Sequence, residues 1–245
     1  MKKLCRAIAM MGLGLGLGLM SHPALAQEEP GFTVEAEVYD PFESFNRGVF
    51  IFNEAVGKVI FTPLATGYRA VTTPAIRGGL SNAAENTLEP VNMVNAFLQG
   101  DFDHGVVSFW RFIINSTVGI VGIHDVAKTA GLERRREDFG QTLGVWGVSE
   151  GPYLVVPLLG PSNFRDVWRW PAGYYLDPVT TFVDDSATVW AYIGALALIE
   201  YESLMDPMND LRAASIDPYA TFRSVYTQQR QAKIRNDHDE SKGNW

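Results

Sequence analysis

Residues 139–161 read FGQTLGVWGVSEGPYLVVPLLGP, an apolar stretch in which Glu150 is the only charged residue. Glycines and prolines interrupt it so often that neither a long helix nor a regular strand fits. Such a segment must satisfy its backbone polar groups while its side chains avoid water. Two environments allow this, the core of a protein and the lining of a cavity at a membrane. On composition alone both stay open.

The first 26 residues have the pattern of a secretory signal peptide. A basic segment at 2–6 precedes an apolar, glycine-rich run at 7–20, and Ala24-Leu25-Ala26 supplies the small residues of a cleavage site. We therefore predict three parts: a cleaved signal peptide at 1–26, one domain at 27–235 and a disordered tail at 236–245.

The predicted exported chain begins at Gln27. A bacterial lipoprotein would need a cysteine at this position, and the only cysteine of the sequence, Cys5, lies in the predicted signal peptide. The exported chain is therefore predicted to have neither a disulfide nor an acylated cysteine, and to carry no lipid anchor.

Charge and hydropathy exclude several classes of protein. The net charge is −8 and becomes more negative once the basic residues of the signal peptide are removed. This argues against binding nucleic acid and against simple electrostatic adhesion to anionic lipid. No uninterrupted apolar run approaches the roughly 20 residues of a membrane-spanning helix. The longest candidate, 187–199, fits a core helix or an interfacial segment.

Helical patterns dominate the chain, and the predicted class is all-α in a single domain. Aspartates that precede apolar-periodic runs predict helix starts, since aspartate is a favoured N-cap. Gly57 is expected to end or weaken the first helix. The predicted helices are 42–56 after Asp40-Pro41, 74–85, 90–98, 102–114 after Asp101, 186–205 after Asp184 or Asp185, and 218–235 after Asp217; the single strand candidate is 153–159, weakened by Pro157.

Catalytic motifs are scarce. The exported chain has three histidines, His104, His124 and His238, each next to an aspartate but without metal-ligand spacing. The sequence also lacks a serine-nucleophile elbow. We predict no enzyme activity, no metal and no cofactor; a lipid hydrolase built around His104 or His124 is the enzymatic alternative. The Arg134-Arg135-Arg136 run fits a phosphate clamp or a solvated turn balanced by neighbouring carboxylates.

Five segments resemble the MlaA family, also called VacJ, and they occur in the order expected for that family. They are DPFESFNRGVFIFN at 40–53, LEPVNMVNAFLQGD at 88–101, RFIINSTVGIVGIHDVA at 111–127, DFGQTLGVWGVSEGPYLVVPLLGPSNFRD at 138–166 and DPYATFRSVY at 217–226. The resemblance covers nearly the whole predicted exported chain.

The resemblance implies a helical ring or disc, with irregular Gly/Pro-rich segments, embedded in one leaflet of the Gram-negative outer membrane. It implies a non-enzymatic protein that associates with a trimeric porin. The family removes mislocalised phospholipids from the outer leaflet and passes them to a periplasmic carrier protein. A porin-bound structural scaffold without a lipid path is the non-enzymatic alternative. Gln27 departs from the best-known family members, which are lipoproteins.

Polar residues within apolar helices are candidates for a path taken by a lipid headgroup. A buried arginine must find partners, and a hydrated path is one way to satisfy it. Helix capping and hydrogen bonding between helices are the alternative. The candidates are Asn82, Asn86, Asn92, Asn95, Arg111 and Asn115.

Two further features admit a membrane interpretation. Gly144, Gly147 and Gly151 would allow a path to open, or would equally allow tight static packing. The aromatic faces of 42–56 and 102–114 would embed in the membrane interface. For any single helix, burial of such a face in the protein core is the more common outcome.

Overall fold

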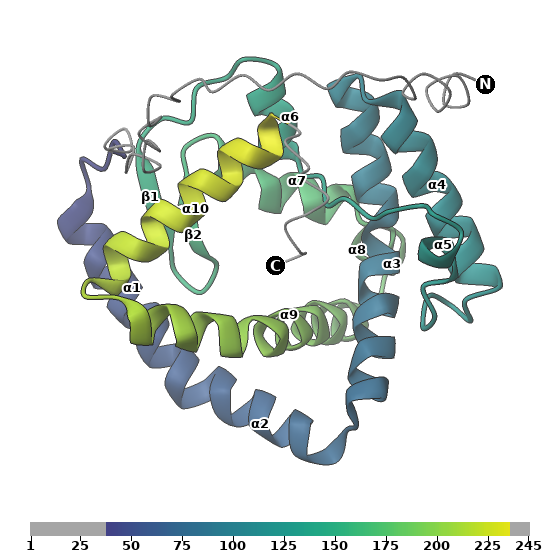
Figure 1. Ribbon diagram of the computed structural model, residues 1–245, viewed down its shortest axis with the longest axis horizontal. Coiled ribbons are helices and arrows are strands. Elements are labelled where there is room, and N and C mark those ends of the chain that lie inside the picture. The colour runs from purple at the N-terminus through teal and green to yellow at the C-terminus, as the bar shows by residue number, and fades with distance from the viewer. Residues whose placement is uncertain (1–37, 236–245) are drawn as a thin grey trace, which may run out of the picture. The chain divides into compact units, whose positions relative to one another are not determined.

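The computed structural model describes residues 38–235, which fold mainly as helices with one short hairpin (Figure 1). The predicted signal peptide and C-terminal tail lie outside these residues. In chain order the elements are α1 (Glu43–Val56), the π-helical turn η1 (Gly57–Phe61), α2 (Thr62–Val71), α3 (Pro74–Gln99), α4 (Phe102–Thr117), α5 (Val126–Thr129), α6 (Phe139–Val145), β1 (Tyr153–Val156), β2 (Gly160–Asn163), the 3₁₀ turn η2 (Asp166–Trp168), α7 (Arg169–Leu176), α8 (Pro178–Phe182), α9 (Ser186–Ala214) and α10 (Pro218–Ile234). The predicted all-α class is confirmed.

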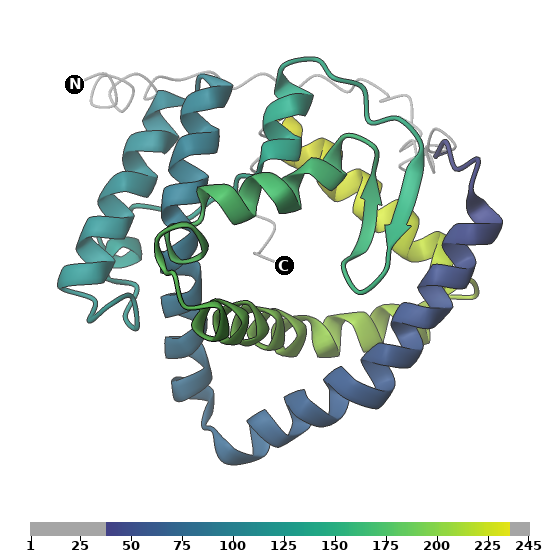
Figure 2. The same ribbon diagram turned by 180° about the vertical axis from the view of Figure 1, so that it is seen from behind.

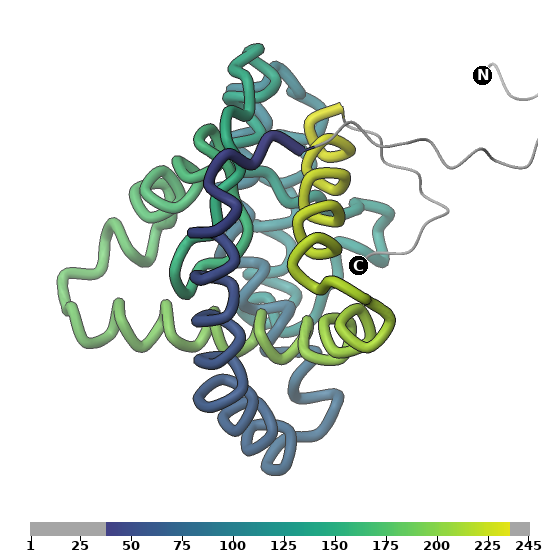
Figure 3. Tube along the Cα trace, turned by 90° about the vertical axis from the view of Figure 1, so that its left-hand side faces the viewer, coloured from purple at the N-terminus to yellow at the C-terminus, as the bar shows by residue number. Residues whose placement is uncertain are grey.

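Four helices close a circuit through their contacts. α3 packs on α6, α6 on α10, α10 on α9, and α9 on α3. In both Figure 1 and Figure 2 the ribbons of residues 38–235 surround a central region. α4 lies against α3, and α2 lies below α9 in Figure 1. Figure 3 shows α1 and α10 side by side, and there Arg47 of α1 pairs with Asp217 at 2.7 Å. The helices of residues 38–235 are therefore arranged in a ring.

The apolar core of the described residues is small. Tyr153, Val155 and Tyr219 are buried together where the hairpin meets α1 and α10. Phe50 of α1 adds an edge-on contact with Tyr219, at 5.8 Å between ring centroids. Aromatic pairs of this kind contribute about 0.5–1.5 kcal/mol beyond the area they bury. This cluster fixes the hairpin against two helices.

Gly57 does not end the first helix, contrary to the prediction. It keeps helical torsions, φ −53° and ψ −51°, and the chain continues through η1 into α2. Tyr201 of α9 holds this turn, because its hydroxyl donates to the Gly57 carbonyl at 3.2 Å and shares a hydrogen bond with Thr62 at 2.8 Å. Its ring also stacks on Phe61. Contacts from a distant helix therefore override the local glycine signal.

The predicted cap at Asp40-Pro41 is also wrong. The helix begins at Glu43, and its N-cap Phe42 has no capping side chain. The Asp40 carboxylate instead accepts hydrogen bonds from Asn46 at 2.8 Å, from Arg223 at 2.9 Å and from the Tyr219 hydroxyl. Asp40 therefore joins the start of α1 to α10.

The helices predicted at 74–85 and 90–98 are one helix, α3, with Pro90 inside it. A proline in a helix interior removes one backbone hydrogen bond and disfavours the helix by about 3 kcal/mol. α3 accommodates it because one long face packs on α4 and buries hydrogen-bonded polar residues on both sides of the proline. Gly100, at φ 80°, ends the helix in the left-handed conformation that favours glycine.

Three of the predicted caps are confirmed. Asp101, Asp185 and Asp217 accept backbone N–H groups at the starts of α4, α9 and α10, at 3.0, 2.8 and 3.3 Å. α9 runs past the predicted end at Met205, through Pro207, to Ala214. Local cap chemistry therefore predicts where these helices begin better than where they end.

The stretch 139–161 is more regular than its composition predicts. It forms the short helix α6, followed by the antiparallel hairpin of β1 and β2, in which Tyr153 is opposite Asn163 and Val156 opposite Gly160. The predicted strand ends before Pro157, as expected from its missing N–H. Leu158, between the strands, and Gly160, the first residue of β2, both have positive φ where the chain reverses.

One helical run is long and apolar enough to cross a membrane, judged by length and composition only. It spans Glu43–Val71 and comprises α1, η1 and α2. Its most apolar 18 residues have a mean hydropathy of 1.3, and 6% of them are buried. The expectation from the sequence concerned uninterrupted apolar runs and therefore did not include this helix. Interspersed polar residues hid the run from a search for uninterrupted apolar sequence.

Candidate functional site

The described residues have a polar interior and an apolar exterior. Arg111, Glu89 and Asn95 have 0% exposure, whereas Phe45 is 63% exposed and Trp190 is 70% exposed. A water-soluble protein normally shows the opposite distribution, because charged side chains are almost never fully buried unless paired. Apolar exteriors of this extent mark surfaces that meet lipid or another protein.

The aromatic faces predicted at 42–56 and 102–114 lie on this exterior. Their burial as core, the more common outcome for a single helix, is therefore wrong here. The next loop continues the apolar surface, and Ile120 and Val121 in it adopt positive φ, which is unusual for β-branched residues. The exposed side chains on these segments are Phe42, Phe45, Ile51, Phe52, Phe102, Val106, Phe109, Trp110, Ile113, Val118, Ile120, Val121 and Ile123.

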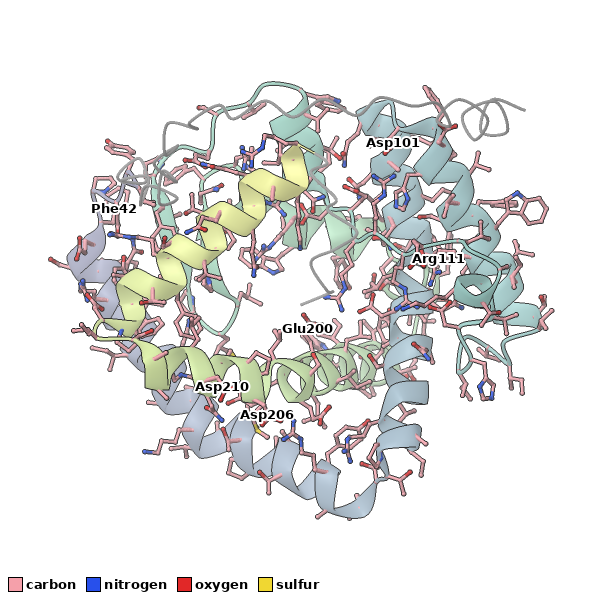
Figure 4. The ribbon with its side chains drawn as sticks, in the orientation of Figure 1. Phe42, Asp101, Arg111, Glu200, Asp206 and Asp210 are labelled. Atoms are coloured by element: carbon pink, nitrogen blue, oxygen red, sulfur yellow. The ribbon has the colours of Figure 1, made fainter. Side chains whose placement is uncertain are left out.

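The centre of the first interior network is Arg111 of α4. Its Nε donates to Glu89 Oε1 of α3 at 2.6 Å, and its Nη2 donates to both Asp125 oxygens at 3.0 and 2.9 Å. Its Nη1 donates to the Leu132 carbonyl. Arg134 adds a second cation, 3.3 Å from Asp125. Figure 4 labels Arg111 beside α3.

The pairing changes the titration of Asp125. Burial alone would raise its pKa, but hydrogen bonds from Arg111 and Asn115, with the charges of Arg111 and Arg134, hold the pKa below its usual value. Burial lowers the pKa of Arg134, helped by the nearby charge of Arg111. The site therefore favours an ionised carboxylate between two guanidinium groups.

The other predicted polar residues hydrogen-bond between elements. Asn92 and Asn95 of α3 accept from the Glu137 backbone N–H at 3.0 Å and from the Thr142 hydroxyl at 2.9 Å. Asn115 of α4 accepts from the Ala127 N–H at 2.9 Å. The alternative of hydrogen bonding between helices therefore describes their contacts here, and a role in a lipid path stays a prediction.

Asn82 and Asn86 lie nearer the other end of α3. Asn82 donates to the Ile123 carbonyl at 3.2 Å, and Asn86 donates to the Ser116 hydroxyl at 2.9 Å. The Asn86 Oδ1 atom is buried and has no hydrogen-bond partner within residues 38–235. Both residues therefore join α3 to the end of α4 and the apolar loop that follows it.

The three candidate glycines differ in what they require. A Cβ at Gly144 would meet Ile234 of α10 at 2.8 Å, so tight packing accounts for this position. Gly147 and Gly151 have φ of 87° and 65°, which glycine adopts without strain. A role in opening a path remains a prediction for all three.

Sequence reasoning missed a second network, centred on Asp166 and Arg230. Arg230 of α10 donates to both Asp138 oxygens at 2.6 Å and to Asp166 at 2.8 Å. Asp166 also accepts from Arg165 at 2.8 Å and from the Tyr226 hydroxyl at 2.6 Å. Asp138 caps α6 as well, and an aspartate directly before an apolar run is the signal that could have found it.

The arginines at 134–136 do not form a turn balanced by adjacent carboxylates. Arg135 pairs with Asp101 at 3.0 Å, and Arg136 pairs with Glu85 and with Glu200 at 3.0 Å. These partners lie on or beside α3, α4 and α9. Figure 4 shows Glu200 on the side of α9 away from α2. The run therefore connects three helices.

Acid should weaken these networks. Hydrogen bonds and nearby arginines lower the pKa of Asp125, Asp138 and Asp166 against the opposing effect of burial. A folded-state pKa below the unfolded value, about 3.9 for aspartate, stabilises the fold above that pH and is lost as pH falls further. Glu137 acts in the opposite direction, because burial raises its pKa.

We therefore expect the urea unfolding midpoint of the purified chain to fall between pH 6 and pH 3. Asp125→Asn should flatten this dependence, because one of the three groups no longer titrates. An unchanged midpoint across this range would contradict the ion-pair interpretation.

The histidines do not assemble a reactive site with one another. His104 is buried, with Nε2 3.4 Å from the Ser108 hydroxyl and 3.3 Å from the Arg135 carbonyl, and His124 is exposed. His238 lies outside the described residues. Within residues 38–235, no group of three His, Cys, Asp or Glu side chains is placed to hold a metal ion.

Comparison with known proteins gives consistent matches. The sequence profile of the family described as MlaA lipoprotein matches residues 38–233. The "Intermembrane phospholipid transport system lipoprotein MlaA" of Escherichia coli is 37% identical over 196 residues, which is 77% of this chain and 76% of that protein. The protein of the same name from Haemophilus influenzae is 31% identical, over 82% and 81% of the two chains.

Two further matches extend the comparison. An uncharacterized protein of Rickettsia prowazekii is 38% identical over 201 residues, covering 81% of this chain and 79% of its own. A solved structure described as "Structural basis for maintenance of bacterial outer membrane lipid asymmetry" has a TM-score of 0.68 and 33% identity. It covers 80% of this chain and 98% of its own.

Proposed function

The chain belongs to the MlaA family, and from that membership we propose that it is the outer-membrane component of intermembrane phospholipid transport. It removes mislocalised phospholipids from the outer leaflet and passes them to a periplasmic carrier protein, which maintains lipid asymmetry. A trimeric porin is its partner in the membrane. We propose no catalytic role.

The inverted distribution of polar and apolar side chains carries this proposal. Exposed aromatic and aliphatic residues on α1, α2 and α4 would face acyl chains, as in interfacial helices. Paired charges and amides are buried between the helices, where a lipid headgroup would meet hydrogen-bonding groups instead of hydrocarbon. A protein with this arrangement lowers the barrier to moving a headgroup across half a bilayer.

Transport of this kind needs no energy source within the chain, whose sequence has no nucleotide-binding motif. The direction would follow from lipid supply and from the affinity of the acceptor. The residues proposed to line or gate the path are Asn82, Asn86, Asn92, Asn95, Arg111, Asn115, Gly144, Gly147 and Gly151.

Attachment to the membrane is proposed to depend on the apolar exterior. Gln27 leaves no cysteine for acylation if cleavage occurs after Ala26, whereas the relatives from E. coli and H. influenzae are named lipoproteins. Loss of an acyl anchor has a limited effect, because a single acyl chain binds membranes only marginally. The exposed face of α1 would supply the attachment instead.

We expect the wild-type chain to stay with the outer-membrane fraction after high-salt and carbonate washing. Phe45→Glu with Phe52→Glu should release it, because a carboxylate on each exposed aromatic position disfavours contact with lipid. Gln228→Glu with Gln229→Glu, on the exposed polar face of α10, adds the same charge and should leave the fraction unchanged. Recovery of the wild type as a soluble protein would contradict an embedded ring.

The transport role is tested in cells by deleting the gene and measuring phospholipid exposed on the cell surface. Surface phospholipid should rise in the deletion strain and return to the wild-type level on complementation. If porin behaviour alone changes while surface phospholipid stays constant, the chain is a scaffold and the proposal fails.

A further inference from the structure

Glu137, just before α6, is a buried carboxylate without a cationic partner. It is 5% exposed. Glu85, Glu89 and Asp166 are also buried, and each of them pairs with an arginine. Within residues 38–235, no cationic side chain lies at ion-pair distance from Glu137, whose printed partners are amides. This is unusual, because acidic side chains are almost never fully buried unless they are paired.

Two glutamine amides take the place of a cation. Gln99 of α3 donates to Glu137 Oε2 at 3.0 Å, and Gln141 of α6 donates to the same oxygen at 2.5 Å. The second oxygen, Oε1, accepts no hydrogen bond within the described part of the chain. The Glu137 backbone N–H donates to Asn92 of α3 at 3.0 Å. The carboxyl group therefore lies between α3 and α6, with one oxygen at which a proton can bind.

The contacts between α3 and α6 extend beyond this carboxyl group. Gln99, which donates to Glu137, also donates to the Thr142 hydroxyl of α6 at 3.3 Å. After the end of α6, the indole N–H of Trp146 donates to the Leu98 carbonyl of α3 at 2.8 Å. A change of charge at Glu137 therefore acts directly on the contacts that fix α6 to α3.

The surroundings do not compensate the charge of Glu137. Burial raises its pKa, and the charges of Asp138 and Asp101 raise it further. The hydrogen bond from Gln99 and the charge of Arg135 act in the opposite direction, but Arg135 is itself paired with Asp101. The titratable and charged residues on this segment and on the elements packed around it are Glu85 and Glu89 of α3, Asp101 and His104 at the start of α4, Arg135, Arg136 and Asp138, and Arg230 of α10.

We propose that Glu137 is a proton-dependent latch between α3 and α6, which holds α6 more tightly when the carboxyl group is protonated. A proton on Oε1 removes a buried charge that has no counterion, and Oε2 can still accept from both glutamines. The start of the 139–161 stretch is then held firmly in mildly acidic surroundings and less firmly at alkaline pH.

The sign of this effect follows from the direction of the pKa shift. Because the pKa of Glu137 is raised in the folded chain, the folded state binds the proton at a pH where the unfolded chain is still ionised. The contact gains stability as pH falls through the folded pKa toward the ordinary glutamate value, about 4.3. The paired aspartates lose stability only at lower pH, so the two effects occur in different ranges.

Trp146 can report on this latch. The full exported chain is labelled with 5-fluorotryptophan in non-ionic detergent, and ¹⁹F NMR follows the Trp146 resonance, assigned with Trp146→Phe, from pH 8 to pH 4. The wild-type resonance should titrate with a midpoint above about 4.3. Glu137→Gln places an amide where the proton would bind and should abolish the titration. Gln99→Met should raise the midpoint by roughly one pH unit, because the ionised carboxylate loses one of its two donors.

Two control variants separate Glu137 from its neighbours. Glu133→Gln, an exposed acidic residue four positions earlier, should leave the titration unchanged. His104→Gln should also leave it unchanged, although histidine ordinarily titrates in this range. Urea unfolding gives the direction of the effect: Glu137→Gln should unfold at a higher urea concentration than the wild type at pH 8, and the difference should shrink at pH 5.

A Trp146 resonance that does not titrate would overturn the latch, as would a titration that survives in Glu137→Gln or disappears in His104→Gln. A Glu137→Gln protein that is less stable than the wild type at pH 8 would overturn the proposed direction. The latch does not rest on the transport function, which is tested separately by surface phospholipid in the deletion strain.

Discussion

Replacing Arg111 by methionine is expected to lower the free energy of unfolding by about 3–5 kcal/mol, the loss typical when one partner of a buried ion pair is removed. Arg111 and Glu89 both have 0% side-chain exposure, and Asp125 shares the same guanidinium. Methionine keeps much of the volume and none of the charge. Two carboxylates would then face each other with only the more distant Arg134 between them. Urea unfolding followed by circular dichroism measures the change.

Arg135→Met is the control for this prediction. Arg135 pairs with Asp101 at 3.0 Å, but about a quarter of each side chain is exposed. Pairs with access to water contribute about 0–1 kcal/mol. Adding Glu89→Gln to Arg111→Met should recover part of the loss, because one buried charge is removed with its partner. A similar small loss for Arg111→Met and Arg135→Met would show that the buried network does not stabilise the fold.

The second large effect is expected at Arg230. Its guanidinium bridges Asp138 at the start of α6 and Asp166 after β2, and these three groups join the two ends of the 139–161 stretch to α10. Arg230→Met should also lower the free energy of unfolding by about 3–5 kcal/mol. Arg230→Lys should fall between the wild type and Arg230→Met, because lysine retains the charge but cannot bind two carboxylates with a planar fork.

Gln229→Met, on the exposed side of the same helix, serves as the control and should change stability by less than about 0.5 kcal/mol. Limited proteolysis gives a second measurement, since Arg230→Met should expose the 139–161 stretch to cleavage. An Arg230→Met protein as stable and as resistant as the wild type would refute the role of this bridge.

Local chemistry predicted much of the helical order. Asp101, Asp185 and Asp217 each cap a helix by accepting a hydrogen bond from the backbone N–H three residues later. This contact is local, so it does not depend on the rest of the chain. The same local rules failed at Gly57 and Pro90, where Tyr201 and the packing of α3 on α4 keep the helix continuous. These contacts depend on residues far away in the sequence.

The site was predictable in part for a different reason. Helical spacing predicts which residues share a face, as with Phe45 and Phe52, but it contains no information on whether that face meets protein or lipid. The partners of Arg230 could not be predicted from local sequence either, since Asp138 and Asp166 are 92 and 64 residues away. Family resemblance supplied the expectation of a ring, and the ion pairs between the helices became visible only in three dimensions.

The π-helical turn at Gly57–Phe61 has a geometric consequence for the exterior. An added residue rotates everything beyond it by about 100° relative to an uninterrupted helix. Phe45 and Leu64 are 19 residues apart, as are Phe52 and Val71, so in an uninterrupted helix the exposed residues of α2 would lie about 100° around the axis from those of α1. The inserted residue cancels this offset and brings the two exposed stripes into line. The whole run from α1 to α2 thus presents its exposed apolar side chains in one direction, while Arg69 pairs with Glu202 of α9.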